Sequence, residues 1–200
     1  MHYFNNYDVG VVYSNYWLIK TDIGKKKLSH KEKLPHGKIY EELLKNYNVG
    51  ILTTVIRKDF YSKLKKKFDE RFSIIGDFDL FLRLSKLYGF ESIQKPLAYY
   101  RLHGGNLSII RKEKEIEELM IWLSENKCNL NASDIKNIQK SINYKKFVNF
   151  KIEKNYKECL KMVLSSKINL FNIKHLILFF TPVILLKKFL WYNKNLDDFV

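Results

Sequence analysis

The sequence predicts an α/β region over residues 1–110, followed by an all-α region over residues 111–200. Two observations indicate the first region: apolar runs rich in β-branched residues, and a helical apolar period that begins at Asp77. The second region is indicated by a change after Ser108, where every segment has helical spacing. With 200 residues and 46% hydrophobic content, the chain can bury one sizeable core, or one domain with an appendage.

The first region is expected to begin with a strand. The run DVGVVYSNYWLI is mostly apolar, which predicts a buried strand. The lysine-rich segment that follows, KTDIGKKKLSHKEKLPHGK, contains Gly and Pro and predicts a surface loop. IYEELLKN predicts a short helix with Ile39, Leu43 and Leu44 on one side, and VGILTTVIRK predicts a second strand.

A basic amphipathic turn, DFYSKLKKKFDERF, leads to the stretch GDFDLFLRLS, where the pattern changes to that of a helix. Leu80, Phe81, Leu84 and Leu87 fall at helical spacing, and Gly89 is placed to end the helix. The segment QKPLAYYRLHGGNLS then predicts an edge strand or its first residues, because its proline cannot donate to a sheet ladder.

The formal net charge of +15 is spread along the whole chain. Residues 1–110 hold 19 basic and 11 acidic side chains, and residues 111–200 hold 17 basic and 10 acidic ones, which excludes a basic tail. Such a charge suits an anionic membrane surface, a phosphate-bearing substrate or nucleic acid, and equally a lysine-rich surface that only solvates the protein. The cysteines, Cys128 and Cys159, have no CxxC or histidine-paired spacing, so reduced structural thiols in a cytoplasmic protein are expected.

One apolar tract, HLILFFTPVILLKKFLW, runs from His175 to Trp191. Its uncharged core, residues 176–186, is shorter than the ~20 residues that a membrane-spanning helix needs, and Pro182 interrupts it. Lysines and aromatic residues flank this core, which indicates peripheral membrane contact through residues 175–192; a buried core helix is the alternative. The N-terminus has no signal segment, so the expected location is cytoplasmic, on the inner face of the plasma membrane if the tract binds there.

Two acids, Asp77 and Asp79, begin the predicted helix. Residues two apart on a helix do not face each other, so these carboxylates are not expected to cooperate. Asp79 has Arg83 four residues on, which predicts an ion pair. The corresponding neighbour of Asp77 is Phe81, and Gly76 before it allows a tight turn and the close approach of a ligand. Asp77 is therefore a candidate general base, with a helix N-cap as the simpler interpretation.

Alternation along the predicted edge strand places Tyr99, Arg101 and His103 on one face. Arginine can hold a phosphate through two hydrogen bonds, and histidine can bind a metal or a phosphate. A histidine in this setting is more often only hydrogen-bonded, so both interpretations stay open. The chain has no Ser-His-Asp signature, phosphate-binding glycine loop or zinc-ligand spacing.

Four segments, taken in order, resemble the second half of a family-2 glycosyltransferase catalytic domain: DVGVVYSNYWLIKTDIG, GKIYEELLKNYNVGILTTVIRK, FDERFSIIGDFDLFLRLS and PLAYYRLHGGNLS. The resemblance covers about residues 4–110, and the acidic motif followed by YRxH is its most specific part. It implies an incomplete GT-A-like domain, of the nucleotide-diphospho-sugar transferase type. It also implies inverting transfer of a sugar from a nucleotide-sugar to a hydroxyl acceptor in surface glycan biosynthesis.

The resemblance also implies roles for individual residues. By position, Asp77 matches the catalytic base that removes the proton of the acceptor hydroxyl. Asp79 and Arg83 match the structural part of the same motif. Arg101 and His103 match residues near the donor diphosphate and the metal, so His103 is a candidate metal ligand.

The resemblance further implies a divalent metal, Mg²⁺ or Mn²⁺, held in the family by a DxD segment that this chain does not contain. The acid in TDIGKKK, Asp22, does not replace it, so the donor-binding half is expected to be absent. The expected partners are the nucleotide-sugar donor, a glycan or lipid-linked acceptor, and a complementing N-terminal polypeptide that would cover an otherwise exposed sheet edge. The alternatives are a non-catalytic truncated remnant or partner subunit, and a basic membrane- or nucleic-acid-binding module; no helix-turn-helix spacing or RNP-like pattern supports nucleic acid.

Overall fold

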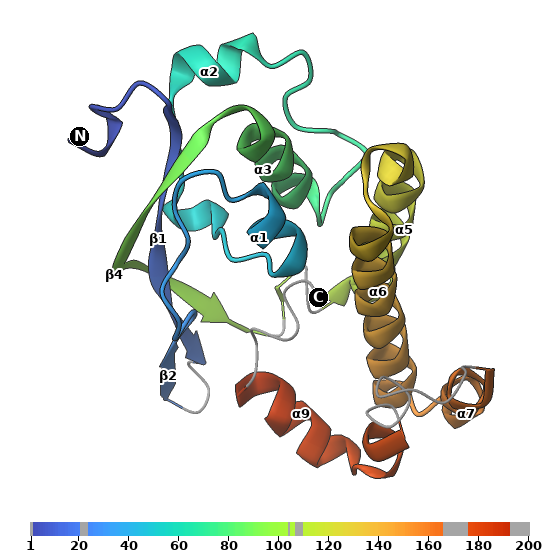
Figure 1. Cartoon of the computed structure of the whole chain (residues 1–200). Helices are drawn as coiled ribbons and strands as arrows, with labels where there is room; N and C mark the ends of the chain where they lie inside the picture. Colours follow the sequence, from blue (N-terminus) through green and yellow to red (C-terminus); the bar gives the residue numbers. More distant parts are fainter. Residues whose placement is uncertain (1, 21–23, 104, 107–109, 166–175, 193–200) are drawn as a thin grey trace. The chain divides into compact units, whose positions relative to one another are not determined.

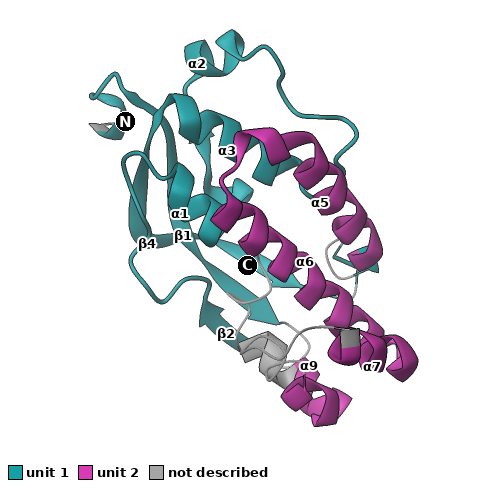
Figure 2. Cartoon of the chain, turned by 45° about the vertical axis from the view of Figure 1, so that its right-hand side comes forward, with its two compact units in different colours: residues 1–111 teal, residues 112–200 magenta. Residues whose placement is uncertain are grey.

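The computed structural model is mixed α/β and divides into two compact units, Met1–Arg111 and Lys112–Val200 (Figure 2). Asp22 and His175, which the sequence interpretation named, lie outside the residues that the structure describes. The described ranges are 2–20, 24–103, 105–106, 110–165 and 176–192.

Unit 1 contains a four-stranded sheet and several short helices (Figure 1). Its elements, in chain order, are η1 (His2–Phe4), β1 (Val9–Lys20), β2 (Lys25–Leu28), α1 (Tyr40–Lys45), η3 (Ile51–Thr53), β3 (Val55–Ile56), α2 (Lys58–Lys63), α3 (Gly76–Leu87) and β4 (Gly89–Leu102).

Strand β1 is the centre of a mixed sheet. β2 and β3 pair with opposite ends of β1 in antiparallel orientation, through Lys20↔Lys25 and Val11↔Ile56 respectively. β4 runs parallel to β1 along almost its full length. Nearly every residue of β1 is buried, which confirms the buried strand that its apolar run predicted.

The pairing of β4 with β1 is interrupted around Pro96. Ser14 pairs with Ile93, but Tyr16 pairs with Ala98, so four residues of β4 stand opposite one of β1. Pro96 falls in this irregular segment, where no ladder hydrogen bond requires its missing N–H. Strand β4 begins at Gly89, five residues before the segment QKPLAYYRLHGGNLS in which the sequence predicted it. It pairs with β1.

Two predicted elements of this unit differ in the structure. The lysine-rich segment is not all loop, because Lys25–Leu28 forms β2 and pairs with β1; Gly24, which precedes β2, has a positive φ of 60°. The second predicted strand shrinks to the two residues of β3. Side-chain hydrogen bonds explain this: Thr53 and Thr54 both donate from Oγ1 to the carbonyl of Gly50, at 3.0 and 2.9 Å, which holds η3 in a turn.

Helices α1 and α3 lie on the same side of the sheet and supply much of its core (Figure 1). The predicted inward side of α1 is confirmed, since Leu43 and Leu44 are buried. The predicted apolar face of α3 is confirmed at Leu80, Phe81 and Leu84, which are buried, but not at Leu87, which is 55% exposed. Gly89 does not end the helix but begins β4, where its N–H donates to the carbonyl of Asp8 at 2.9 Å.

Gly10 in β1 is required by the close approach of two aromatic rings. A Cβ at this position would lie 2.7 Å from the Cβ of Tyr88 and 2.9 Å from Cδ2 of Phe60, two residues whose rings are stacked.

We expect Gly10→Ala to lower the free energy of unfolding by about 1–3 kcal/mol, because the stacked rings must move. Urea unfolding measures this. Gly76→Ala is the control, since its Cβ would meet only Phe68 at 3.6 Å; an equal loss there would contradict the steric explanation.

Unit 2 is built from helices: α5 (Lys112–Asn126), η4 (Lys127–Asn129), α6 (Ala132–Ile152), α7 (Tyr156–Ser165) and α9 (Val183–Tyr192). Asn131 caps α6, because its side-chain oxygen accepts a hydrogen bond from Asp134 N at 2.8 Å. A cluster of buried residues joins α6, α7 and the segment 176–186: Tyr144, Phe147, Val148, Cys159, Leu178 and Leu186. Among the described residues, no helix is long and apolar enough to cross a membrane.

Candidate functional site at the start of helix α3

Asp77 is the second residue of α3 and is half-buried. Its Oδ1 accepts a hydrogen bond from the backbone N–H of Phe78 at 2.9 Å. The residue at the N-cap is Ile75, so the N-cap interpretation of Asp77 was wrong. The carboxylate lies within the first turn, where the backbone N–H groups and the positive end of the helix dipole favour negative charge.

Asp79 does pair with Arg83. The Asp79 carboxylate is buried, and its Oδ2 accepts from Nη2 and Nε of Arg83 at 2.7 and 3.0 Å. The same guanidinium donates to the backbone carbonyls of Lys66 and Lys67. The pair therefore ties α3 to residues 66 and 67 of the loop that precedes it. Asp79 thus has a structural position distinct from that of Asp77.

The loop held by Arg83 is basic and carries an aromatic ring over the helix start. The lysines at 63, 65, 66 and 67 are exposed. Phe68 reaches within 3.6 Å of the position that a Cβ on Gly76 would occupy. Gly76 is not among the described glycines with positive φ, so its backbone does not require glycine; a larger residue there would touch Phe68. Phe68 thus places an apolar ring beside the start of α3, and the loop that precedes the helix is basic.

Asp69 anchors the other end of this loop. It is 5% exposed, and it accepts from Arg71 Nη2 at 2.7 Å and from the Lys66 ammonium. The hydrogen bonds from Arg71, and then those from Lys66, hold the pKa of Asp69 well below its usual range despite the opposing effect of burial.

The low pKa of Asp69 predicts a pH-dependent contribution to stability. A carboxyl with a lowered pKa in the folded state stabilises the fold above its unfolded pKa of about 4, and this contribution is lost as pH falls toward the folded value. Lys66 and Arg71, the two cations that pair with Asp69, are half-exposed, so each pair contributes modestly. We expect Asp69→Asn to lower the free energy of unfolding by on the order of 1 kcal/mol at neutral pH, and by progressively less below about pH 4. Urea midpoints of both proteins at neutral and acid pH test this; a difference independent of pH would contradict it.

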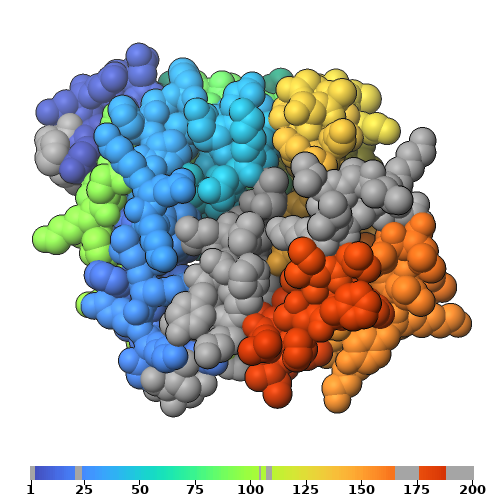
Figure 3. All heavy atoms as spheres, turned by 60° about the horizontal axis from the view of Figure 1, so that its bottom comes forward, coloured from blue at the N-terminus to red at the C-terminus, as the bar shows by residue number. Residues whose placement is uncertain are grey.

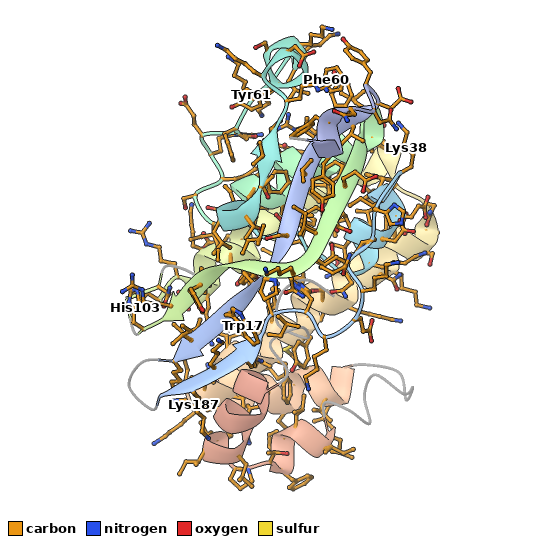
Figure 4. The ribbon with its side chains drawn as sticks, turned by 90° about the vertical axis from the view of Figure 1, so that its left-hand side faces the viewer. Trp17, Lys38, Phe60, Tyr61, His103 and Lys187 are labelled. Atoms are coloured by element: carbon orange, nitrogen blue, oxygen red, sulfur yellow. The ribbon has the colours of Figure 1, made fainter. Side chains whose placement is uncertain are left out.

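Arg101 lies at the C-terminal end of β4, and His103 follows the strand directly; both side chains are exposed. Figure 4 shows His103 at this end of the sheet. The predicted alternation is confirmed: Tyr99, Arg101 and His103 are exposed, while Leu102 between them is buried. Asn106 closes the following turn, because its Oδ1 accepts from His103 N at 2.6 Å and its Nδ2 donates to the Arg101 carbonyl at 3.2 Å.

The ring of His103 already takes part in this turn. Its Nδ1 accepts from Gly105 N at 3.1 Å, which leaves Nε2 as the ring nitrogen directed away from the backbone. No group of three His, Cys, Asp or Glu residues that could hold a metal is present in the part of the chain that the structure describes. A metal role of His103 stays a prediction.

Sequence reasoning missed an aromatic and cationic cluster at the same end of the sheet. The Lys26 ammonium lies 4.0 Å from the ring centre of Trp17 and 5.3 Å from that of Tyr99. Trp17 pairs with Tyr99 across β1 and β4. The signal was hidden because β2 was expected to be loop, and only its pairing with β1 places Lys26 beside these rings.

A scan against protein-family models found no match for the chain. A search of curated proteins also returned no relative.

Proposed function

We propose that unit 1 is the acceptor-side part of a GT-A-like domain that transfers a sugar, with inversion, from a nucleotide-sugar to a hydroxyl group of a surface glycan or its lipid-linked precursor. The observation that supports the proposal is the difference in surroundings between the two acids of α3. Asp79 is buried in an ion pair with Arg83, whereas Asp77 stands half-buried in the first turn of the helix. The order of the segments that resemble family-2 glycosyltransferases adds to it.

In this proposal Asp77 is the general base. The acceptor oxygen forms a bond to the anomeric carbon of the donor sugar while the bond from that carbon to the diphosphate oxygen breaks. The acceptor proton passes to the carboxylate of Asp77, and the nucleoside diphosphate leaves with the bonding electrons. Attack from the side opposite the leaving group inverts the anomeric configuration.

The surroundings of Asp77 are compatible with an anionic donor. Exposed lysines, Lys65, Lys66 and Lys67, stand in the loop that precedes α3, and the positive end of the α3 dipole lies at the helix start. Arg101 and His103 are exposed on β4, where a guanidinium and the Nε2 of an imidazole can donate to phosphate oxygens. We assign them to the donor diphosphate, as positions to be tested.

Calorimetric titration with UDP, with and without Mn²⁺, tests donor binding by this chain. Saturable binding that Arg101→Ala weakens would support the assignment of the donor site. Binding that appears only when a complementing polypeptide is added would instead favour the partner-subunit alternative. Assays of nucleoside diphosphate release, with a panel of nucleotide-sugars and extracted lipid-linked acceptors, then test transfer itself.

A further inference from the structure

The segment 176–187 of unit 2 is apolar on two sides. Leu178 and Leu186 face inward, in the cluster with α6 and α7. The outward side also carries apolar residues: Phe180 is 75% exposed and Ile184 is 81% exposed. The water-facing side of a helix in a globular protein is normally polar, so this arrangement indicates a surface that meets something other than water.

Two further residues of this segment and two of α7 extend the apolar surface. Ile177 and Leu185 are exposed beside Phe180 and Ile184, and Leu160 and Leu164 are exposed on α7. Figure 3 shows α7 and the segment 176–187 side by side on one face of unit 2, and the buried cluster joins them. We name the six exposed residues the apolar face: Leu160, Leu164, Ile177, Phe180, Ile184 and Leu185.

The elements that carry the apolar face also carry exposed lysines. Lys157, Lys161 and Lys187 are exposed on the same elements. Glu158 is the acid of α7, and it pairs with Lys161 at 2.5 Å. In the sequence, residues 154–194 contain eight lysines and one acidic residue. An apolar surface bordered by lysines is complementary to the anionic headgroups and acyl chains of a bilayer.

We propose that the apolar face lies in the interfacial layer of a membrane that contains anionic lipid. A second copy of the chain is a poorer occupant, because two such lysine-rich surfaces would repel each other. The segment lies on the bilayer rather than across it, since α9 has only 10 residues. This inference refines the membrane contact expected for residues 175–192 by naming its side chains, and it does not depend on the proposed sugar transfer. The side chains of Lys188, Trp191 and Tyr192, and residue Lys194, lie outside the described part and are not used.

Vesicle flotation of the full chain tests the proposal. We expect binding to vesicles with about one third phosphatidylglycerol, at least tenfold weaker binding to pure phosphatidylcholine, and loss of the difference at high salt. The double variant Phe180→Ser/Ile184→Ser should bind the anionic vesicles at least tenfold more weakly. Ile177→Ser/Leu185→Ser tests the same face independently, with circular dichroism as the check of folding for both.

The control is Ile51→Ser/Val55→Ser, two exposed apolar residues of unit 1, which should leave vesicle binding within twofold of wild type. Unchanged vesicle binding by both variants of the apolar face would overturn the proposal, as would failure of the wild-type chain to bind anionic vesicles. Analytical ultracentrifugation provides a further test. A concentration-dependent dimer that Phe180→Ser/Ile184→Ser abolishes would assign the face to a second copy instead.

Discussion

Asp77→Asn is expected to reduce the rate of sugar transfer by about 10²–10⁴-fold, because the amide cannot accept the proton of the acceptor hydroxyl. The fold should persist, since the amide oxygen can still accept from Phe78 N, as the Asp77 Oδ1 does at 2.9 Å. The measurement is the initial rate of nucleoside diphosphate release, with the donor and acceptor pair that supports turnover by the wild-type protein. Donor affinity from calorimetry should change little.

The chain offers a matched control for this variant. Asp59 is the second residue of α2, as Asp77 is of α3, so Asp59→Asn removes the same charge from the same helical position. We expect its rate of transfer to stay within twofold of wild type. Full turnover by Asp77→Asn, or an equal loss in Asp59→Asn, would remove Asp77 from the role of base.

Asp79→Ala is expected to have the largest effect on stability among the charged positions of α3. It leaves the guanidinium of Arg83, which is 29% exposed, without its buried carboxylate, and it loosens the contacts of Arg83 with Lys66 and Lys67. Breaking such a pair from one side costs about 2–3 kcal/mol of unfolding free energy, somewhat less than for a fully buried pair. Urea unfolding measures the loss.

Glu158→Ala is the control for Asp79→Ala. It also breaks an ion pair within one turn of a helix, but that pair is exposed, and we expect a loss below about 0.5 kcal/mol. If Asp79→Ala lost no more unfolding free energy than Glu158→Ala, burial would not determine how much the Asp79–Arg83 pair stabilises the protein. If Asp79→Ala kept its stability but lost sugar transfer, the two acids of α3 would have exchanged roles.

The parts of unit 1 that sequence reasoning predicted are those in which local pattern and burial agree. The apolar run of β1 and the spacing of Leu43 and Leu44 in α1 describe surfaces that are buried in the structure. The Asp79–Arg83 pair follows from helical geometry alone, because residues four apart lie on one face.

The remaining parts depend on contacts between segments distant in sequence. Lys25–Leu28 has a loop-like composition and becomes a strand through its pairing with β1. The ring of Phe68 over Gly76 and the contact of Arg83 with Lys66 depend on the path of a loop that has no periodic pattern. The hydroxyl of Thr53 hydrogen-bonds to the carbonyls of Ser14 and Gly50, and these bonds hold η3 in a turn although its sequence is rich in β-branched residues.

The most direct test of the central claim is the anomeric configuration of the product, determined by proton NMR on material formed from an α-linked nucleotide-sugar. Attack by an acceptor oxygen whose proton passes to Asp77 predicts a β-linked product, formed by the wild-type protein and not by Asp77→Asn. An α-linked product would contradict direct displacement, and a β-linked product formed equally well by Asp77→Asn would contradict the role of this carboxylate.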